Sequence, residues 1–127
     1  MTGERPALLF AGRAPISGYG KGVFRTGGVQ HHGSLLILPD GTYAWPVTSA
    51  AELNLDSLAL VLNAPSPGFL LLGTGAAQIF PGRPLRDAFA SAGLGLEAMD
   101  TGAACRTYNV LLGEERAFAA ALIALPA

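Results

Sequence analysis

The sequence predicts one domain of the α/β class, and three observations support that prediction. Its 127 residues correspond to the usual length of one domain. Residues 50–125 alternate between helix-like and strand-like segments, which is typical of a sheet flanked by helices with parallel connections. Residues 16–47 form short strand-like runs separated by glycine, which indicates antiparallel strands joined by tight turns. Residues 1–15 contain two prolines and little periodicity, so we expect a loose N-terminal arm before a domain of residues 16–127.

The clearest strand of the first half is the run Ser-Leu-Leu-Ile-Leu at residues 34–38. It ends at the sequence Pro-Asp-Gly, residues 39–41, where proline presets φ and glycine tolerates a positive φ, so a turn is expected. Residues 42–45 then form the partner strand of a hairpin. Pro46 limits how far that strand can pair, because proline has no N–H to donate.

The second half begins with apolar residues at helical spacing. They recur at positions 55, 58, 59 and 62, the i, i+3, i+4, i+7 pattern of an amphipathic helix. Asn54 or Asp56 is the expected N-cap, and the run Pro-Ser-Pro-Gly at residues 65–68 ends the helix. The apolar run at residues 69–72 has no alternation, which is typical of a central strand covered on both faces.

Two more helices and two more strands complete the pattern. The first of these helices has a proline in its first turn, where proline is tolerated, and glycine after its end. The second has Asp100 as its expected N-cap and Gly113 as its expected stop. The expected ranges are 84–92 and 101–112 for the helices and 96–99 and 118–125 for the strands.

Composition excludes several classes of function. Half of the residues are apolar and 13% are charged, which favours a protein partner or self-association into a homo-oligomer. The net charge is −1 and Lys21 is the only lysine, so the clustered positive charge that nucleic-acid binding requires is missing. The single cysteine excludes an internal disulfide and fits a reducing compartment. No run reaches the ~18 apolar residues of a membrane span, and we expect a cytoplasmic protein without a cofactor.

The glycine-rich turn that follows residues 69–72 is the first candidate ligand site. Gly73, Thr74 and Gly75 lie at the carboxyl end of that strand, where open α/β sheets place their ligands. Their amides could face a small anion or a metabolite. The dinucleotide fingerprint and the G-x-x-x-x-G-K-[S/T] phosphate loop are both missing from the sequence. The alternative is a tight turn that packs against the next loop.

The second candidate segment is Asp100-Thr101-Gly102, which spells the active-site triplet of aspartic proteases. That mechanism needs two such aspartates sharing a proton, and residues 103–127 are too few for the rest of such a protease. A helix N-cap explains Asp100 better. A ligand site would then lie between the turn at residues 73–75 and the helix that starts at Asp100 and Thr101.

Three further residues of the same helix complete the candidate set. Cys105 lies in the first turns, where the helix dipole would lower the pKa of a thiol, but a lone cysteine is more often a small buried apolar residue. His31 and His32 are distant in sequence, so neither a Cys-His pair nor a metal site has support. Arg106 and Asn109 share a helix face and either meet a ligand or partner or tie the helix to neighbouring loops. No catalytic set is complete, so we expect no enzyme.

Two segments resemble a known family. Residues 72–75 (Leu-Gly-Thr-Gly) and residues 99–109 (Met-Asp-Thr-Gly-Ala-Ala-Cys-Arg-Thr-Tyr-Asn) are similar to the small domains of unknown function that include the mitochondrial complex I assembly factor 3. Upstream, residues 33–39 and Trp45 fit the same pattern, so the resemblance covers about residues 16–125. It implies a three-layer α/β fold with a mixed central sheet, about three flanking helices and an added antiparallel β hairpin.

The resemblance also implies a role. Its mitochondrial members help to assemble the respiratory NADH:ubiquinone oxidoreductase and have no established catalytic residues. By that resemblance the partners would be proteins, among them respiratory-complex subunits, met at the cytoplasmic side of the inner membrane. The sequence shows no mitochondrial presequence, and Arg106 and Tyr108 look like the bacterial form of the motif, so we expect a bacterial protein.

Overall fold

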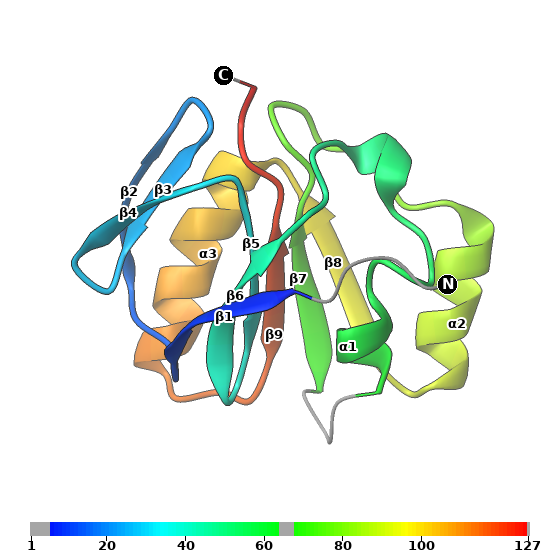
Figure 1. The fold of residues 1–127 in the computed structure, drawn as a ribbon. Helices are drawn as coiled ribbons and strands as arrows, with labels where there is room; N and C mark the ends of the chain where they lie inside the picture. Colours follow the sequence, from blue (N-terminus) through cyan, green and yellow to red (C-terminus); the bar gives the residue numbers. More distant parts are fainter. Residues whose placement is uncertain (1–5, 64–67, 127) are drawn as a thin grey trace.

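The middle layer of the fold is a six-stranded mixed sheet, and a smaller sheet of three strands lies beside it (Figure 1). The structure, a computed structural model, describes residues 6–63 and 68–126. The strands are β1 Ala7–Ala11, β2 Ile16–Gly20, β3 Val23–Thr26, β4 Val29–His32, β5 Ser34–Leu38, β6 Gly41–Trp45, β7 Phe69–Gly73, β8 Gly95–Met99 and β9 Ala119–Leu122. The large sheet has the order β1-β6-β5-β9-β7-β8 and the small one β2-β3-β4. Among the strand pairs of the described residues, only β9-β7 and β7-β8 are parallel.

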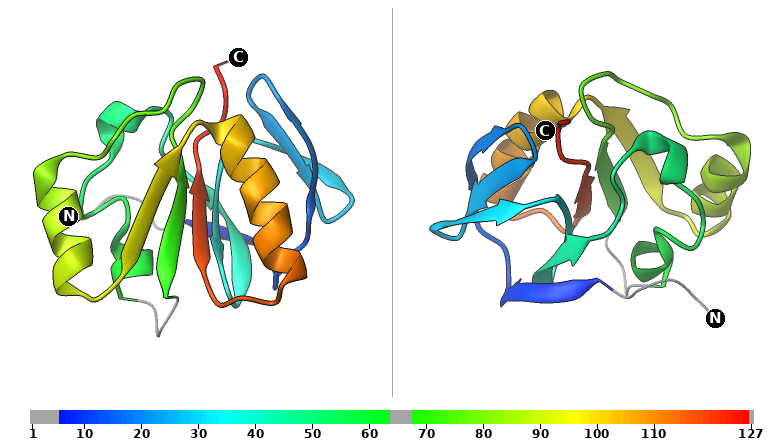
Figure 2. Two further views of the ribbon diagram at one scale, coloured as in Figure 1. Left: turned by 180° about the vertical axis from the view of Figure 1, so that it is seen from behind. Right: turned by 45° about the horizontal axis from the view of Figure 1, so that its top comes forward.

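Helices cover both faces of the large sheet (Figure 2). Together with β2 and β3, α3 covers one face, and the core there is built around Tyr108, Phe118 and Phe24. On the other face α1 and α2 enclose a second core that includes Trp45 and Phe89. The helices are α1 Ala59–Leu62, α2 Arg83–Ser91 and α3 Thr101–Gly113.

The central strand β7 is buried on both faces, as its unbroken apolar run predicts. Leu71 packs into the core beneath α3, whereas Leu70 and Leu72 pack into the core beneath α1 and α2, and all three are at most 1% exposed. The predicted three-layer α/β fold with a mixed sheet is therefore confirmed. The added antiparallel element is a three-stranded sheet rather than a two-stranded hairpin.

The two longer helices follow their predicted start signals. Pro84 stands in the first turn of α2, where its missing N–H costs nothing. Asp100 is the N-cap of α3, and its Oδ1 accepts a hydrogen bond from the Ala103 N–H at 2.9 Å. The N-cap prediction for Asp100 is thus confirmed.

The end of α3 differs from the prediction. Gly113 is the last helical residue, and the residue with left-handed backbone is Glu115, with φ of 58°. The Glu115 N–H donates to the Leu112 carbonyl at 3.1 Å and the Arg116 N–H to the Leu111 carbonyl at 3.4 Å. This is the bond pattern of a Schellman cap, which is usually closed by glycine. Glu115 therefore carries the conformational cost that glycine would avoid.

Replacing Glu115 with glycine is expected to stabilise the protein by about 1 kcal/mol, because glycine adopts positive φ without steric cost. For a chain of this length the unfolding midpoint should rise by roughly 4 °C, which differential scanning calorimetry can measure. Glu115→Ala is the matched control, since it removes the carboxylate but keeps the Cβ. If alanine stabilised as much as glycine, the side chain rather than the backbone would be responsible.

The first predicted helix is much shorter than its pattern indicates. Only Ala59–Leu62 is α-helical, and its N-cap, Leu58, has no side-chain capping bond. Asn54 instead accepts from the Ser57 N–H at 2.8 Å, which forms a turn before the helix, and Leu55 is 48% exposed. The predicted proline stop at residues 65–67 lies outside the described residues.

The N-terminal segment is not a loose arm over its described part. Residues Ala7–Ala11 form the edge strand β1, which pairs antiparallel with β6 and has an irregularity between Leu8 and Phe10. The Gly12 N–H also donates to the Asp40 carbonyl at 2.9 Å. The expectation of a loose arm was wrong because this strand is stabilised by hydrogen bonds to a distant segment. Its sequence shows little alternation of apolar and polar residues, and Leu8 is 57% exposed. Residues 1–5 lie outside the described part.

Candidate functional site

The two candidate segments meet at the carboxyl ends of the parallel strands. The Thr101 N–H donates to the Gly75 carbonyl, and the Gly75 N–H donates to Thr101 Oγ1, each at 2.8 Å. The Thr101 hydroxyl in turn donates to the Ile123 carbonyl at 2.6 Å. Thr101 is fully buried. This one side chain therefore joins the loop after β7, the start of α3 and the end of β9.

Thr74 makes a second set of bonds at the same junction. Its N–H donates to the Met99 carbonyl at 2.9 Å, and its hydroxyl donates to the Ala77 carbonyl at 2.6 Å and accepts from the Ile79 N–H at 3.0 Å. The side chain of Thr74 is 3% exposed. The Thr74 and Gly75 amides thus already have protein acceptors, and an anion at this turn would have to replace them.

Gly73 is required by the close approach of α3 to β7. A Cβ at this position would lie 3.1 Å from both the Ala104 Cβ and the Thr101 Oγ1, and 3.2 Å from a methyl group of Leu122. Such contacts are tighter than a packed core tolerates without movement. The first glycine of the turn therefore serves packing, whatever else the turn does.

Cys105 lies inside the molecule, in the core beneath α3. Its side chain is 2% exposed, and burial raises the pKa of the thiol to about 12, although Arg106 nearby acts in the opposite direction. The expected effect of the helix dipole is thus outweighed by the loss of hydration, which disfavours the thiolate. Cys105 packs as a small apolar residue.

The Cys105 thiol is expected to resist alkylation in the folded protein. At pH 8 a thiol with a pKa of about 12 holds roughly a thousandfold less thiolate than one with the ordinary value, and the thiolate is the reactive form. Reaction with iodoacetamide, followed by mass spectrometry, should be at least a hundredfold slower in buffer than in 6 M guanidinium chloride.

The same burial predicts a pH dependence of stability. The pKa of Cys105 is higher in the folded than in the unfolded chain, so its contribution is complete below pH 9 and is lost as pH rises towards 12. A free energy of unfolding that increased over this range would contradict the assignment.

Arg106 and Asn109 share a helix face but have different environments. Arg106 is exposed, and its Nη1 donates to the Tyr19 hydroxyl at 3.3 Å. Asn109 accepts from the Ile16 N–H at 2.8 Å and donates to the Ile16 carbonyl at 2.9 Å. Of the two readings left open by sequence, the structure therefore favours a tie between α3 and β2 for Asn109.

The eight candidate residues thus do not form one surface. Gly73, Thr74, Gly75, Asp100 and Thr101 meet at the strand ends, Cys105 points into the core, and Arg106 and Asn109 face the small sheet. Their role in ligand binding stays a prediction. Within residues 6–63 and 68–126, no three His, Cys, Asp or Glu side chains gather as metal ligands. None of the described helices is long and apolar enough to cross a membrane.

Sequence reasoning missed a groove between α2 and the outer side of β8. It has a volume of about 560 Å³ and is partly open. The sequence feature that could have indicated this groove is the apolar pair Ile79-Phe80. It lies between β7 and α2, in a segment without helical or strand periodicity. The groove is lined by, among others, Gln78, Phe80, Arg86, Phe89, Leu94 and Leu96.

Comparison with known proteins identifies relatives of this chain. The family described as "Protein of unknown function (DUF498/DUF598)" matches residues 16–123. An uncharacterized protein of Rhodobacter capsulatus is 38% identical over 92% of this chain and 90% of its own length. NADH dehydrogenase (ubiquinone) 1 alpha subcomplex assembly factor 3 of Danio rerio is 34% identical over 88% of this chain, which spans 65% of that protein. The crystal structure of an outer membrane protein from Bartonella henselae is similar at a TM-score of 0.85 and 38% identity, over 91% of this chain and 98% of that one.

Proposed function

This chain belongs to the DUF498/DUF598 family of proteins of unknown function, and from that membership we propose that it is a non-enzymatic assembly or interaction factor. The observation that carries the proposal is the similarity to assembly factor 3, which extends over 88% of the chain. By this proposal its partners are protein subunits, including those of a respiratory complex. It would meet them in the cytoplasm, at the inner face of the membrane.

The positions of the two candidate reactive residues, Asp100 and Cys105, support this proposal. Asp100 uses its carboxylate to cap α3, and Cys105 is buried with a raised pKa. Both residues therefore have structural explanations. The low share of charged residues, 13%, also fits a surface that meets other proteins.

A pull-down from the native host tests the proposal. The tagged full chain is expressed at its natural level, cross-linked in cells and purified, and the recovered proteins are quantified by mass spectrometry. We expect subunits of a respiratory or other membrane complex to be enriched at least tenfold over a control with the tag on an unrelated protein of similar size. Recovery of no such subunit would count against an assembly role.

The alternative is a small-anion or metabolite site between the Gly73–Gly75 turn and the start of α3. Its support is the position of both segments at the carboxyl ends of parallel strands, but the Gly75 amide would have to leave Thr101. Titration with inorganic phosphate, followed by NMR, would test it. A saturable shift of the Gly75 and Thr74 amide signals would favour this site, and unchanged signals at 10 mM phosphate would exclude phosphate as its ligand.

A further inference from the structure

One side of the edge strand β8 is open to an additional strand. Among the strands of the described residues, β8 pairs only with β7. The Gly95 N–H and the Met99 carbonyl are both used on the β7 side, by the Gly68 carbonyl and the Thr74 N–H. Because backbone groups alternate along a strand, the N–H and C=O of Leu96 and Ala98 point to the outer side. Leu96 can therefore exchange two hydrogen bonds with an added strand.

Only one outward group of β8 is already occupied. The Gln78 side-chain amide donates to the Ala98 carbonyl at 2.9 Å. The bonds of the described residues give no partner on that side to the Ala98 N–H or to either backbone group of Leu96. The edge is partly covered at its carboxyl end and open at Leu96, where the groove begins.

The rim of this groove carries an exposed aromatic side chain. Phe80 is 72% exposed and its neighbour Ile79 is 47% exposed. Their loop is held by the Ile79 N–H bond to Thr74 Oγ1 at 3.0 Å. Two adjacent apolar side chains that are solvent-exposed on a loop fixed by hydrogen bonding are typical of an interaction site. At such a site an aromatic residue often supplies much of the binding energy.

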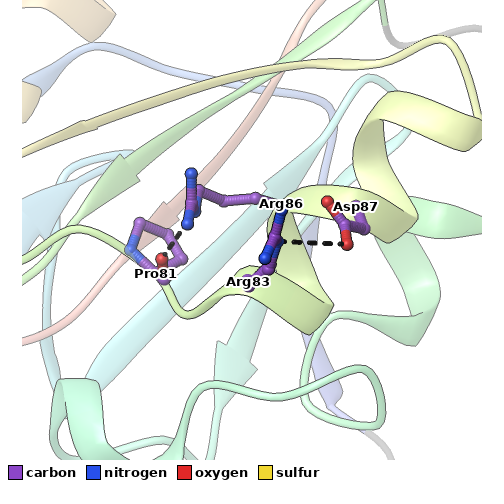
Figure 3. Close-up of polar contacts among 4 residues, drawn as sticks. All are labelled: Pro81, Arg83, Arg86 and Asp87. Atoms are coloured by element: carbon purple, nitrogen blue, oxygen red, sulfur yellow. Dashed lines mark hydrogen bonds and ion pairs between the residues drawn. The ribbon is translucent and has the colours of Figure 1, made fainter.

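The same groove carries a cation without a carboxylate partner. Arg86 donates from Nε to the Pro81 carbonyl at 3.1 Å (Figure 3). The neighbouring ion pair joins Arg83 to Asp87 and does not include Arg86. Among the described residues Arg86 makes no ion pair. Glu97 also borders the groove. Leu96 and Ala98, on either side of it, pack towards α2, so alternation turns the Glu97 side chain to the opposite face.

We propose that the groove between β8 and α2 binds an extended segment of a protein partner, which adds to the sheet next to β8. Leu96 would bond the backbone of this segment, Phe80 would cover an apolar side chain, and Arg86 would pair with a carboxylate. A second copy of this chain fits less well. If β8 paired antiparallel with β8 of a second copy, the Glu97 side chain of that copy would lie on the face of the sheet opposite Arg86. The inference rests on the proposed function and names the surface that would serve it.

A library of random dodecapeptides displayed on phage provides the probe. It is selected on the immobilised full chain and counter-selected on the Phe80→Asp variant. We expect enriched peptides with alternating apolar residues and at least one carboxylate. Fluorescence anisotropy should show at least tenfold weaker binding of such a peptide to Phe80→Asp and to Arg86→Gln. Amide hydrogen exchange at Leu96 should slow at least tenfold when the peptide binds.

Matched variants separate this site from the rest of the surface. Val110→Asp alters an exposed apolar residue on α3 and Arg83→Gln an exposed arginine on the same helix as Arg86, so both should bind like the wild type. Failure to enrich peptides, Kd values within twofold for all variants, or unchanged exchange at Leu96 would overturn the inference. A dimer in sedimentation equilibrium that protects Leu96 without peptide would do the same and assign the edge to a second copy.

The pull-down distinguishes failure here from failure of the proposed function. If the wild type and Phe80→Asp recover the same subunits equally well, the groove is not the binding surface but the assembly role stands. If the wild type recovers none while the groove still binds peptides, the assembly role is wrong and the groove stands.

Discussion

Replacing Thr101 with valine is expected to lower the free energy of unfolding by about 3 kcal/mol. Valine has nearly the shape of threonine but neither donates nor accepts a hydrogen bond. The Ile123 carbonyl would lose its donor at 2.6 Å and the Gly75 N–H its acceptor at 2.8 Å. Thr101 is fully buried, so water cannot replace these bonds, and each unpaired group costs the full price of dehydration.

Urea unfolding, monitored by circular dichroism, measures this loss of unfolding free energy. In thermal unfolding, the midpoint temperature should fall by roughly 10 °C. Thr101→Ser is the matched control, because it keeps the hydroxyl and removes only a methyl group, at a cost of about 1 kcal/mol. Equal losses for valine and serine would show that packing, rather than hydrogen bonding, explains the burial of Thr101.

Elements with local start and stop signals could be predicted from the sequence. Pro84 and Asp100 mark the starts of α2 and α3, and Pro39-Asp40 forms the turn that joins β5 to β6. The expected positive φ at Gly41 was wrong, because Gly41 is already the first residue of β6, where a Cβ would lie 2.7 Å from a methyl group of Leu8. These signals act within a few residues, because a cap or a turn depends on neighbouring backbone groups. The parallel β7-α2-β8 unit followed from the order of these elements.

Elements that depend on distant partners were mispredicted. β1 is stabilised by β6, about 30 residues away, and nothing within residues 7–11 reports that pairing. The expected helix at residues 55–62 has the right apolar spacing, yet only its last turn is helical. There Leu58 and Val61 are buried against the core, whereas the preceding segment turns through the Asn54–Ser57 bonds. Tertiary packing outweighs a short amphipathic pattern.

The candidate site was only partly predictable for the same reason. That Gly73–Gly75 and Asp100 meet follows from the parallel strands that precede them. That Thr101 fills the bonds of Gly75 depends on Ile123, which arrives from a third segment. The outer edge of β8 was also unpredictable, because which strand ends a sheet depends on the pairing of all the others.

Replacing Asn109 with alanine is expected to cost about 2 kcal/mol, the second largest loss among these variants. The Asn109 amide pairs with the N–H and the C=O of Ile16, much as an adjacent strand would. These are its two bonds to β2, and Ile16 itself is 5% exposed beneath α3. Without the amide, two partly buried backbone groups lose their partners. Amide hydrogen exchange at Ile16 should then be faster, because the free energy of the opening that exposes this N–H falls by about the same amount.

The neighbouring residue on the same face supplies the control. Arg106 makes one long bond of 3.3 Å to the exposed Tyr19 hydroxyl, so Arg106→Ala should change stability by less than about 0.5 kcal/mol. Asn109→Asp keeps the acceptor for the Ile16 N–H but turns a carboxylate towards the Ile16 carbonyl, and it should be at least as harmful as alanine at neutral pH. If Asn109→Ala proved as mild as Arg106→Ala, the pair with Ile16 would contribute little. Asn109 would then return to consideration as part of an exposed binding face with Arg106, because a residue that adds nothing to folding is free to serve a partner.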